Sequence, residues 1–145
     1  MKIEKVNDHQ IRCTLTKADL ADRELKISEL AYGTEKAKSL FKDMMQQAEE
    51  KGVKILLPID CTIAKDFPNP IDAEIEVEVV DADKIPADKE GVDIGPKTAK
   101  LFADAVLSAK TVVWNGPMGV SEWENFSGGT KAVAKAAQDS KVARI

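Results

Sequence analysis

Residues 111–137 read TVVWNGPMGVSEWENFSGGTKAVAKAA, and this stretch decides the fold that we expect. A short apolar run over 111–114 stops at Asn115-Gly116-Pro117, and a second pattern after Gly119 has helical spacing, with apolar residues at Ala132, Val133, Ala136 and Ala137. Strand, glycine-bearing loop and helix follow in this order where α/β proteins build ligand loops at the carboxyl ends of strands. The stretch therefore predicts an α/β domain with a binding loop, although a plain connection can have the same order.

The length and the charge of the chain limit the classes of partner that the protein can bind. The chain has 145 residues, enough for one compact domain or two very small ones, and its 21 basic and 25 acidic residues give a net charge of −4. No basic patch stands out, so we expect no nucleic-acid partner. No apolar run approaches the roughly 20 residues that span a bilayer. We expect no membrane association and a cytoplasmic location.

Catalytic and metal-binding motifs are missing from the sequence. Cys13 and Cys61 lie far apart, and no Cys/His cluster with zinc-ligand spacing occurs. The single histidine, His9, has no Ser, Cys or acid partner placed with it by any motif. We therefore assign no catalytic residue and no metal ligand.

The first half predicts a β-hairpin followed by helices. Apolar residues alternate with polar ones around Ile11, Cys13 and Leu15. Thr16 can cap a short helix over residues 17–23, and Thr34 can cap a longer one. The buried face of the longer helix is predicted to hold Ala37, Leu40, Phe41, Met44, Met45 and Ala48. Gly52 is placed to end this helix.

The second half predicts strands alternating with helices. Apolar runs predict strands over 54–57 and 111–114, and over 59–64 and 74–80, which could pair as an antiparallel ribbon. A helix starting at Lys97 or Thr98 would bury Leu101, Phe102, Ala105 and Val106. The predicted fold class is α/β, a partial Rossmann-like, mostly parallel sheet with flanking helices, preceded by a small β-hairpin plus helices segment.

Three phrases carry a family resemblance: KGVKILLPID at 51–60, GVDIGPKT at 91–98, and WNGPMGV at 114–120 with GTKAVA following at 129–134. Together they resemble the C-terminal, nucleotide-binding domain of phosphoglycerate kinase, over about residues 48–145. That family transfers a phosphoryl group between 1,3-bisphosphoglycerate and ADP. The resemblance implies ADP or ATP with Mg²⁺ as the bound groups.

The resemblance also implies a set of nucleotide-binding residues. Gly91 and Val92 would line the adenine pocket, and Asn115, Pro117 and Val120 would line the base and ribose side. Glu122 would hydrogen-bond the ribose hydroxyls. The family usually has Leu at position 92 and Phe at position 121, where this chain has Val and Ser. The serine removes an aromatic wall, so we expect a looser pocket.

Other parts of the family pattern do not occur in this sequence. They include the family's amino-terminal domain, the glycine-rich segment that carries a lysine, and the G-G-G-D phrase whose aspartate binds the metal. The sequence ends in a predicted strand over 141–145, just before that phrase would come. We therefore expect a fragment that is inactive alone, with at most residual ADP or ATP binding.

Residues 1–47 show a second resemblance. The opening IEKVN, the phrase LTKADLADR, the turn ELAY and the ending DMM resemble the amino-terminal domain of the Mec-type adaptor of the Clp protease. This suggests a chimera with a seam near residues 46–51 and two domains, 1–47 and 48–145. The alternatives to a kinase fragment are a non-enzymatic adaptor that binds a protein partner through residues 1–47, or a fusion product without selected function.

Overall fold

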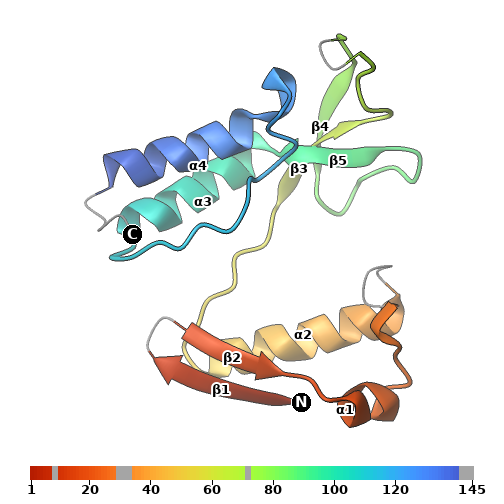
Figure 1. Cartoon of the computed structure of the whole chain (residues 1–145), viewed down its shortest axis with the longest axis vertical. Coiled ribbons are helices and arrows are strands. Elements are labelled where there is room, and N and C mark those ends of the chain that lie inside the picture. Colours follow the sequence, from red (N-terminus) through yellow and green to blue (C-terminus); the bar gives the residue numbers. More distant parts are fainter. Residues whose placement is uncertain (8–9, 29–33, 71–72, 141–145) are drawn as a thin grey trace. The chain divides into compact units, whose positions relative to one another are not determined.

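The computed structural model describes residues 1–7, 10–28, 34–70 and 73–140. The chain divides into two compact units, residues 1–55 and residues 56–145. Figure 1 shows a hairpin with helices in the first unit, and a small sheet with a pair of helices in the second. The turn ELAY, residues 29–32, and the predicted strand over 141–145 lie outside the described residues.

The first unit begins with the predicted hairpin. Strand β1 (Lys2–Asn7) pairs antiparallel with β2 (Gln10–Thr14), so that Ile3 lies opposite Cys13. Helix α1 (Lys17–Asp22) follows, and its start is a capping box. The Thr16 hydroxyl accepts from the Asp19 amide at 3.1 Å, and the Asp19 carboxylate accepts from the Thr16 amide at 2.8 Å. This cap confirms the predicted helix start.

Helix α2 (Glu35–Glu50) is the long helix that the sequence predicts. The Thr34 hydroxyl accepts from the Ala37 amide at 3.2 Å, which caps the helix as expected. The buried side chains of this unit form a cluster of Leu20, Leu25, Ala37 and Leu40. Phe41 remains 50% exposed, so the buried stripe is narrower than predicted. Gly52 adopts a φ of 74°, which a glycine tolerates, and marks the end of the helix.

The second unit is built on a three-stranded sheet in the order β4-β3-β5. Its strands are β3 (Asp60–Ala64), β4 (Val77–Asp81) and β5 (Glu90–Ile94), and β3 pairs antiparallel with both neighbours. The predicted antiparallel ribbon is thereby confirmed, although β4 begins later than expected. The predicted mostly parallel pairing is wrong for the described sheet, since both of its ladders are antiparallel.

Two predicted strands, over 54–57 and 111–114, do not form. A strand requires a neighbour for its backbone hydrogen bonds, and neither run is paired along its length among the described residues. Several of their apolar side chains remain exposed, including Ile55, Leu57 and Val113, and Val113 reaches 88%. The parallel part of the predicted sheet depended on these two runs. Strand β5 was not predicted, because EGVDI lacks the alternation that marks a half-buried strand.

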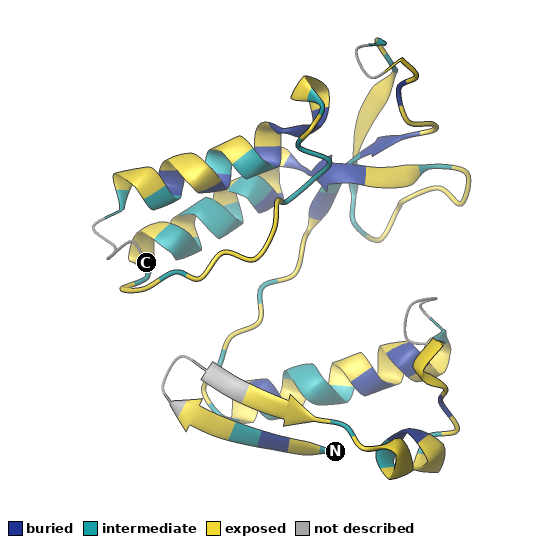
Figure 2. Ribbon diagram, viewed as in Figure 1, coloured by how far each residue is buried: buried dark blue, intermediate teal, exposed yellow. Residues whose placement is uncertain are grey.

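Two helices follow the sheet. Helix α3 (Pro96–Ser108) and helix α4 (Gly128–Asp139) pack side by side, and a short 3-10 helix, Glu124–Phe126, precedes α4 (Figure 1). Figure 2 shows buried positions on β3 and β5. Ala64, Val92 and Phe126 form a buried cluster there, which Ile75, Val120 and Trp123 extend. The α/β class, with small sheets and flanking helices, is confirmed.

Candidate functional site

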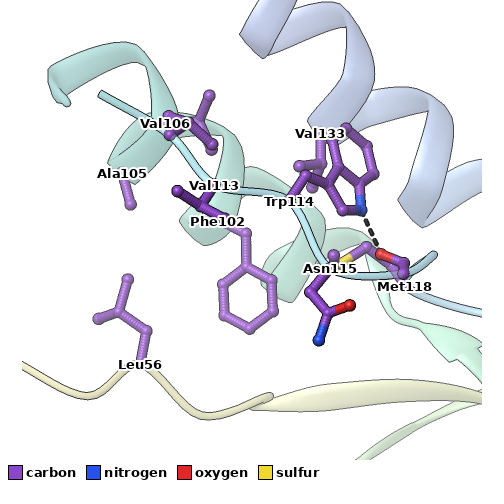
Figure 3. Close-up of a pocket in the computed structure, with 11 residues that line it drawn as sticks. Leu56, Phe102, Ala105, Val106, Val113, Trp114, Asn115, Met118 and Val133 are labelled. Carbon is purple, nitrogen blue, oxygen red and sulfur yellow. Dashed lines mark hydrogen bonds between the residues drawn. The ribbon is translucent and has the colours of Figure 1, made fainter. Parts of the chain in front are cut away.

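The candidate loop, Asn115–Val120, lies between α3 and α4 and borders an apolar cavity. The indole Nε1 of Trp114 donates a hydrogen bond to the carbonyl of Gly116, which turns the loop at a φ of 93°. The cavity has a volume of about 270 Å³. Its wall contains the side chains of Leu56, Phe102 and Val133, which Figure 3 shows around the loop. Asn115 provides a polar side chain at this wall.

This cavity explains why the apolar face of α3 is less buried than predicted. Phe102, Ala105 and Val106 are half-buried, and they line the cavity instead of a closed core. A mostly apolar concave surface with a polar side chain at its edge suits the planar part of a small ligand. The cavity thus offers van der Waals contact and one amide for orientation.

The structure brings two of the predicted site segments together. The Val120 amide donates to the Val92 carbonyl at 2.9 Å, so the end of the loop lies against β5. Val92 is only 2% exposed and belongs to the buried cluster that Val120 extends. Val92 is therefore a core residue in this chain, while its neighbour Gly91 is exposed.

The other predicted site residues are spread along the loop and beyond it. Asn115 lines the cavity, Pro117 is exposed at the turn, and Glu122 is exposed two residues beyond Val120. The structure therefore joins the segments at 92 and 120 by a hydrogen bond. It does not gather all six residues around one cavity.

Two buried aspartates, which the sequence reasoning missed, hold the starts of the two helices. The Asp60 carboxylate is 1% exposed and accepts from the Lys97 amide at 3.0 Å and the Thr98 amide at 2.7 Å. The Thr98 hydroxyl also donates to it at 2.6 Å. The first-turn amides of α3 thus have an acceptor from a strand far away in sequence.

Asp93 plays the corresponding part at α4. Its Oδ2 atom accepts from the Gly129 amide at 2.8 Å, and its Oδ1 atom accepts from the Ile94 amide at 2.8 Å. Each aspartate lies on a strand, and its partners lie in G-P-K-T or G-G-T phrases at a helix start. An aspartate on a predicted strand, followed later in the chain by a glycine-bearing phrase at a helix start, is the sequence signal that could have identified these two aspartates.

Close backbone approach explains the glycines beside these carboxylates. A Cβ atom on Gly95 would lie 2.2 Å from Asp60 Cγ, and one on Gly129 would lie 2.3 Å from Ile94 Cγ1. Real side chains cannot come this close, so a residue other than glycine would displace the Asp60 carboxylate at position 95 and the Ile94 side chain at position 129. The two helix starts are therefore packed directly onto the strand aspartates.

The pKa of Asp60 follows from these contacts. Burial alone would raise it, but the hydroxyl and amide of Thr98 and the amide of Lys97 outweigh burial and hold the pKa below its usual value. The carboxylate is thus ionised at neutral pH. A negative group at the start of α3 repels a second anion, so this helix start is not open to a phosphate.

The described residues do not fit a Mg²⁺ site. Within residues 1–7, 10–28, 34–70 and 73–140, no group of three or more His, Cys, Asp or Glu residues is placed to hold a metal ion. The buried carboxylates of Asp60 and Asp93 accept hydrogen bonds from helix amides.

Every helix in the described part of the chain is too short or too polar to span a lipid bilayer.

Comparisons with known proteins identify one family. A family model described as phosphoglycerate kinase matches residues 5–145. The phosphoglycerate kinase of Clostridium botulinum (strain Alaska E43 / Type E3) is 55% identical over 104 residues, which cover 72% of this chain and 25% of that protein. That of Bifidobacterium adolescentis is 54% identical over 102 residues, covering 70% and 25%.

A solved structure shows the same relationship. The phosphoglycerate kinase of Coxiella burnetii matches with a TM-score of 0.66 and 31% identity, over 75% of this chain and 27% of that one. The chain thus spans about a quarter of the length of the relatives it matches. The family-model match includes most of residues 1–47, and these comparisons give no support to a chimera or an adaptor segment.

Proposed function

Because the chain belongs to the phosphoglycerate kinase family, we propose that it binds the base and ribose of ADP or ATP at the loop Asn115–Val120 without transferring phosphate. The observation that carries this proposal is the hydrogen bond between the Val120 amide and the Val92 carbonyl at 2.9 Å. It joins the two segments that the family resemblance assigns to the adenine pocket and the ribose side.

The chemistry of the loop supports binding of the apolar part of a nucleotide. The cavity wall is mostly apolar, and Asn115 adds an amide that can donate to and accept from a base or a ribose. Glu122 is exposed and close in sequence, and the resemblance assigns it to the ribose hydroxyls. A carboxylate accepting two hydroxyl hydrogens is an ordinary way to hold a ribose.

The phosphate side has no comparable support in the part of the chain that the structure describes. Phosphoryl transfer depends on positive charge around the phosphates and on positioning of the two substrates. Residues 111–130, which contain the loop, include no Lys or Arg. The starts of α3 and α4 are held by the carboxylates of Asp60 and Asp93. We therefore propose that the chain alone does not catalyse the kinase reaction.

Calorimetric titration of ADP into the whole chain tests binding. We expect saturable binding with Kd on the order of a millimolar, since a partial site loses the phosphate contacts that would repay the cost of association. Asn115→Ala and Glu122→Gln are each expected to weaken binding by about fivefold, the loss of one hydrogen bond worth about 1 kcal/mol.

The matched control is Glu76→Gln, which makes the same change at an exposed residue. It is expected to bind ADP like the wild type. Absence of saturable binding by the wild type, or equal Kd values for all variants, would overturn the proposal. Turnover that depends on ADP and bisphosphoglycerate, in a coupled assay with the pure chain, would overturn the predicted inactivity.

The adaptor alternative for residues 1–47 stays a prediction from sequence. Retention of a Clp-type ATPase or its substrates by the immobilised chain is its test, and absence of retention would contradict it.

A further inference from the structure

Three contacts attach the carboxyl half of the candidate loop to the rest of the second unit. The Val120 amide donates to the Val92 carbonyl of β5 at 2.9 Å, and the Met118 amide donates to the Thr130 hydroxyl of α4 at 3.0 Å. Between these two bonds Gly119 lies against Asp93. Two hydrogen bonds and one close backbone contact thus act on three consecutive residues.

The contact at Gly119 is too close for any side chain. A Cβ atom at this position would lie 2.5 Å from Asp93 Oδ1 and 2.7 Å from Asp93 Cα. The second of these atoms belongs to the backbone of β5, so the obstruction cannot be relieved by rotating a side chain. The loop therefore rests directly on the strand at Asp93.

Asp93 and Thr130 connect the same three elements. The Asp93 carboxylate, which is 8% exposed, accepts from the Gly129 amide at 2.8 Å and so holds the start of α4 on β5. Thr130, the next residue of α4, accepts from the Met118 amide. The carboxylate fixes the helix, the helix places the hydroxyl, and the hydroxyl fixes the loop above the carboxylate.

Within the described residues, the amino half of the loop lacks such attachment. Asn115, Gly116 and Pro117 are exposed, and the bond from Trp114 Nε1 to the Gly116 carbonyl is local. Asn115 lies three residues before Met118, so we expect that fixing Met118 limits the directions in which Asn115 can face the cavity. A residue that fixes Met118 acts on Asn115 through the backbone.

We propose that Asp93 and Thr130 are positioning residues for the loop, and that they raise nucleotide affinity by holding it in its binding conformation. The nucleotide part of this proposal rests on the proposed function. Neither residue is expected to touch the ligand. Their effect is preorganisation, since an unattached loop must be ordered at the expense of binding free energy.

The test uses Thr130→Val in the whole chain, since valine keeps the shape and removes the hydroxyl. We expect exchange of the Met118 amide hydrogen, measured by NMR without nucleotide, to become about tenfold faster because its acceptor is lost. We expect the Kd for ADP to rise about fivefold, the effect of one hydrogen bond. Thr130→Ser keeps the hydroxyl and should restore both values.

The control is Thr111→Val, which makes the same change at an exposed residue outside the loop. It should leave Met118 exchange and ADP affinity unchanged. If Thr130→Val does not fold, Thr130→Ala removes the same acceptor with a smaller side chain and gives the same two measurements.

The outcomes separate this inference from the proposed function. Unchanged Met118 exchange in Thr130→Val, or faster exchange with unchanged ADP affinity, overturns the positioning role. If the wild type itself binds no ADP, the proposed function fails, and with it the part of this inference that concerns affinity. In that case the exchange measurement alone decides whether Thr130 holds the loop.

Discussion

At the scale of single residues, Asp60 holds the start of α3. Its carboxylate is 1% exposed and accepts from the Lys97 amide, the Thr98 amide and the Thr98 hydroxyl at 2.6 to 3.0 Å. Asparagine has the same shape but turns one oxygen into a donor. The substitution would therefore leave at least one buried amide of α3 facing another donor.

We expect Asp60→Asn to lower the free energy of unfolding by about 2 to 3 kcal/mol at pH 7, the cost of breaking hydrogen bonds to a charged group. Urea unfolding followed by tryptophan fluorescence measures this, since Trp114 and Trp123 both lie in the second unit. Asp83→Asn, at an exposed residue, is the control and should change stability by less than about 0.5 kcal/mol.

The wild type and Asp60→Asn should also differ in how their stability changes as the pH falls. The folded pKa of Asp60 lies below its usual value, so its ionised form contributes stability that is fully present above the unfolded pKa of about 3.9. This contribution is lost as the pH falls from about 4 through the folded pKa. The stability difference between wild type and Asp60→Asn should be constant above about pH 5 and shrink below pH 4. A constant difference down to the acid transition would contradict this role.

At the scale of elements, helix propensity and packing have opposite effects on an alanine substitution at the start of α4. Alanine is favoured over glycine by about 1 kcal/mol inside a helix, so Gly129→Ala would be stabilising on propensity alone. A Cβ atom there would lie 2.3 Å from Ile94 Cγ1 and 2.5 Å from Asp93 Oδ1. Relieving these overlaps requires both the Ile94 side chain and the carboxylate that holds the helix to move, or β5 to shift.

We therefore expect packing to outweigh propensity, with Gly129→Ala destabilising by about 1 to 3 kcal/mol, the usual cost of overpacking. Gly128→Ala is a matched control on the adjacent residue, where a Cβ atom would lie at an ordinary 3.7 Å from Asp93 Oδ2. Gly128→Ala should leave the thermal midpoint unchanged or slightly raised. Similar midpoints for the two variants would show that the close contact at Gly129 relaxes without cost.

At the scale of the whole molecule, the second unit exposes apolar strand surface. Strand β4 lies at one edge of the described sheet, and its residues Val77 and Val79 are 42% and 52% exposed. An unpaired edge strand with apolar side chains is a template for pairing with another chain. We expect the protein to associate as its concentration rises.

Val79→Lys should reduce this association, because a lysine on an edge strand opposes pairing. Sedimentation velocity over a concentration series measures the effect. Ala134→Lys adds the same charge at an exposed position of α4 and is the control for net charge. Equal suppression by both variants would point to charge repulsion in general. A wild type that stays monomeric throughout would contradict the prediction.

The helices could be predicted from the sequence because their signals are local. Thr16 and Thr34 cap α1 and α2 as expected, and Gly52 ends α2. Each of these signals acts on amides or dihedral angles within a few residues, so no other part of the chain is needed to satisfy it. The pairing of 59–64 with 74–80 could also be predicted from the sequence, since two strands joined by a short connection can pair antiparallel without a crossover.

The sheet order, the missing strands and the helix caps were decided only by tertiary structure. The runs 54–57 and 111–114 have strand-like composition, but a strand exists only where a neighbour accepts its hydrogen bonds, and no local pattern states whether one is present. Asp60 caps a helix that begins 36 residues further on, at Pro96, and Asp93 caps one that begins 35 residues further on, at Gly128. The sequence alone determined the family phrases and the loop at 115–120. The three-dimensional fold decided that Val92 is buried beneath that loop, because burial depends on which distant residues pack there.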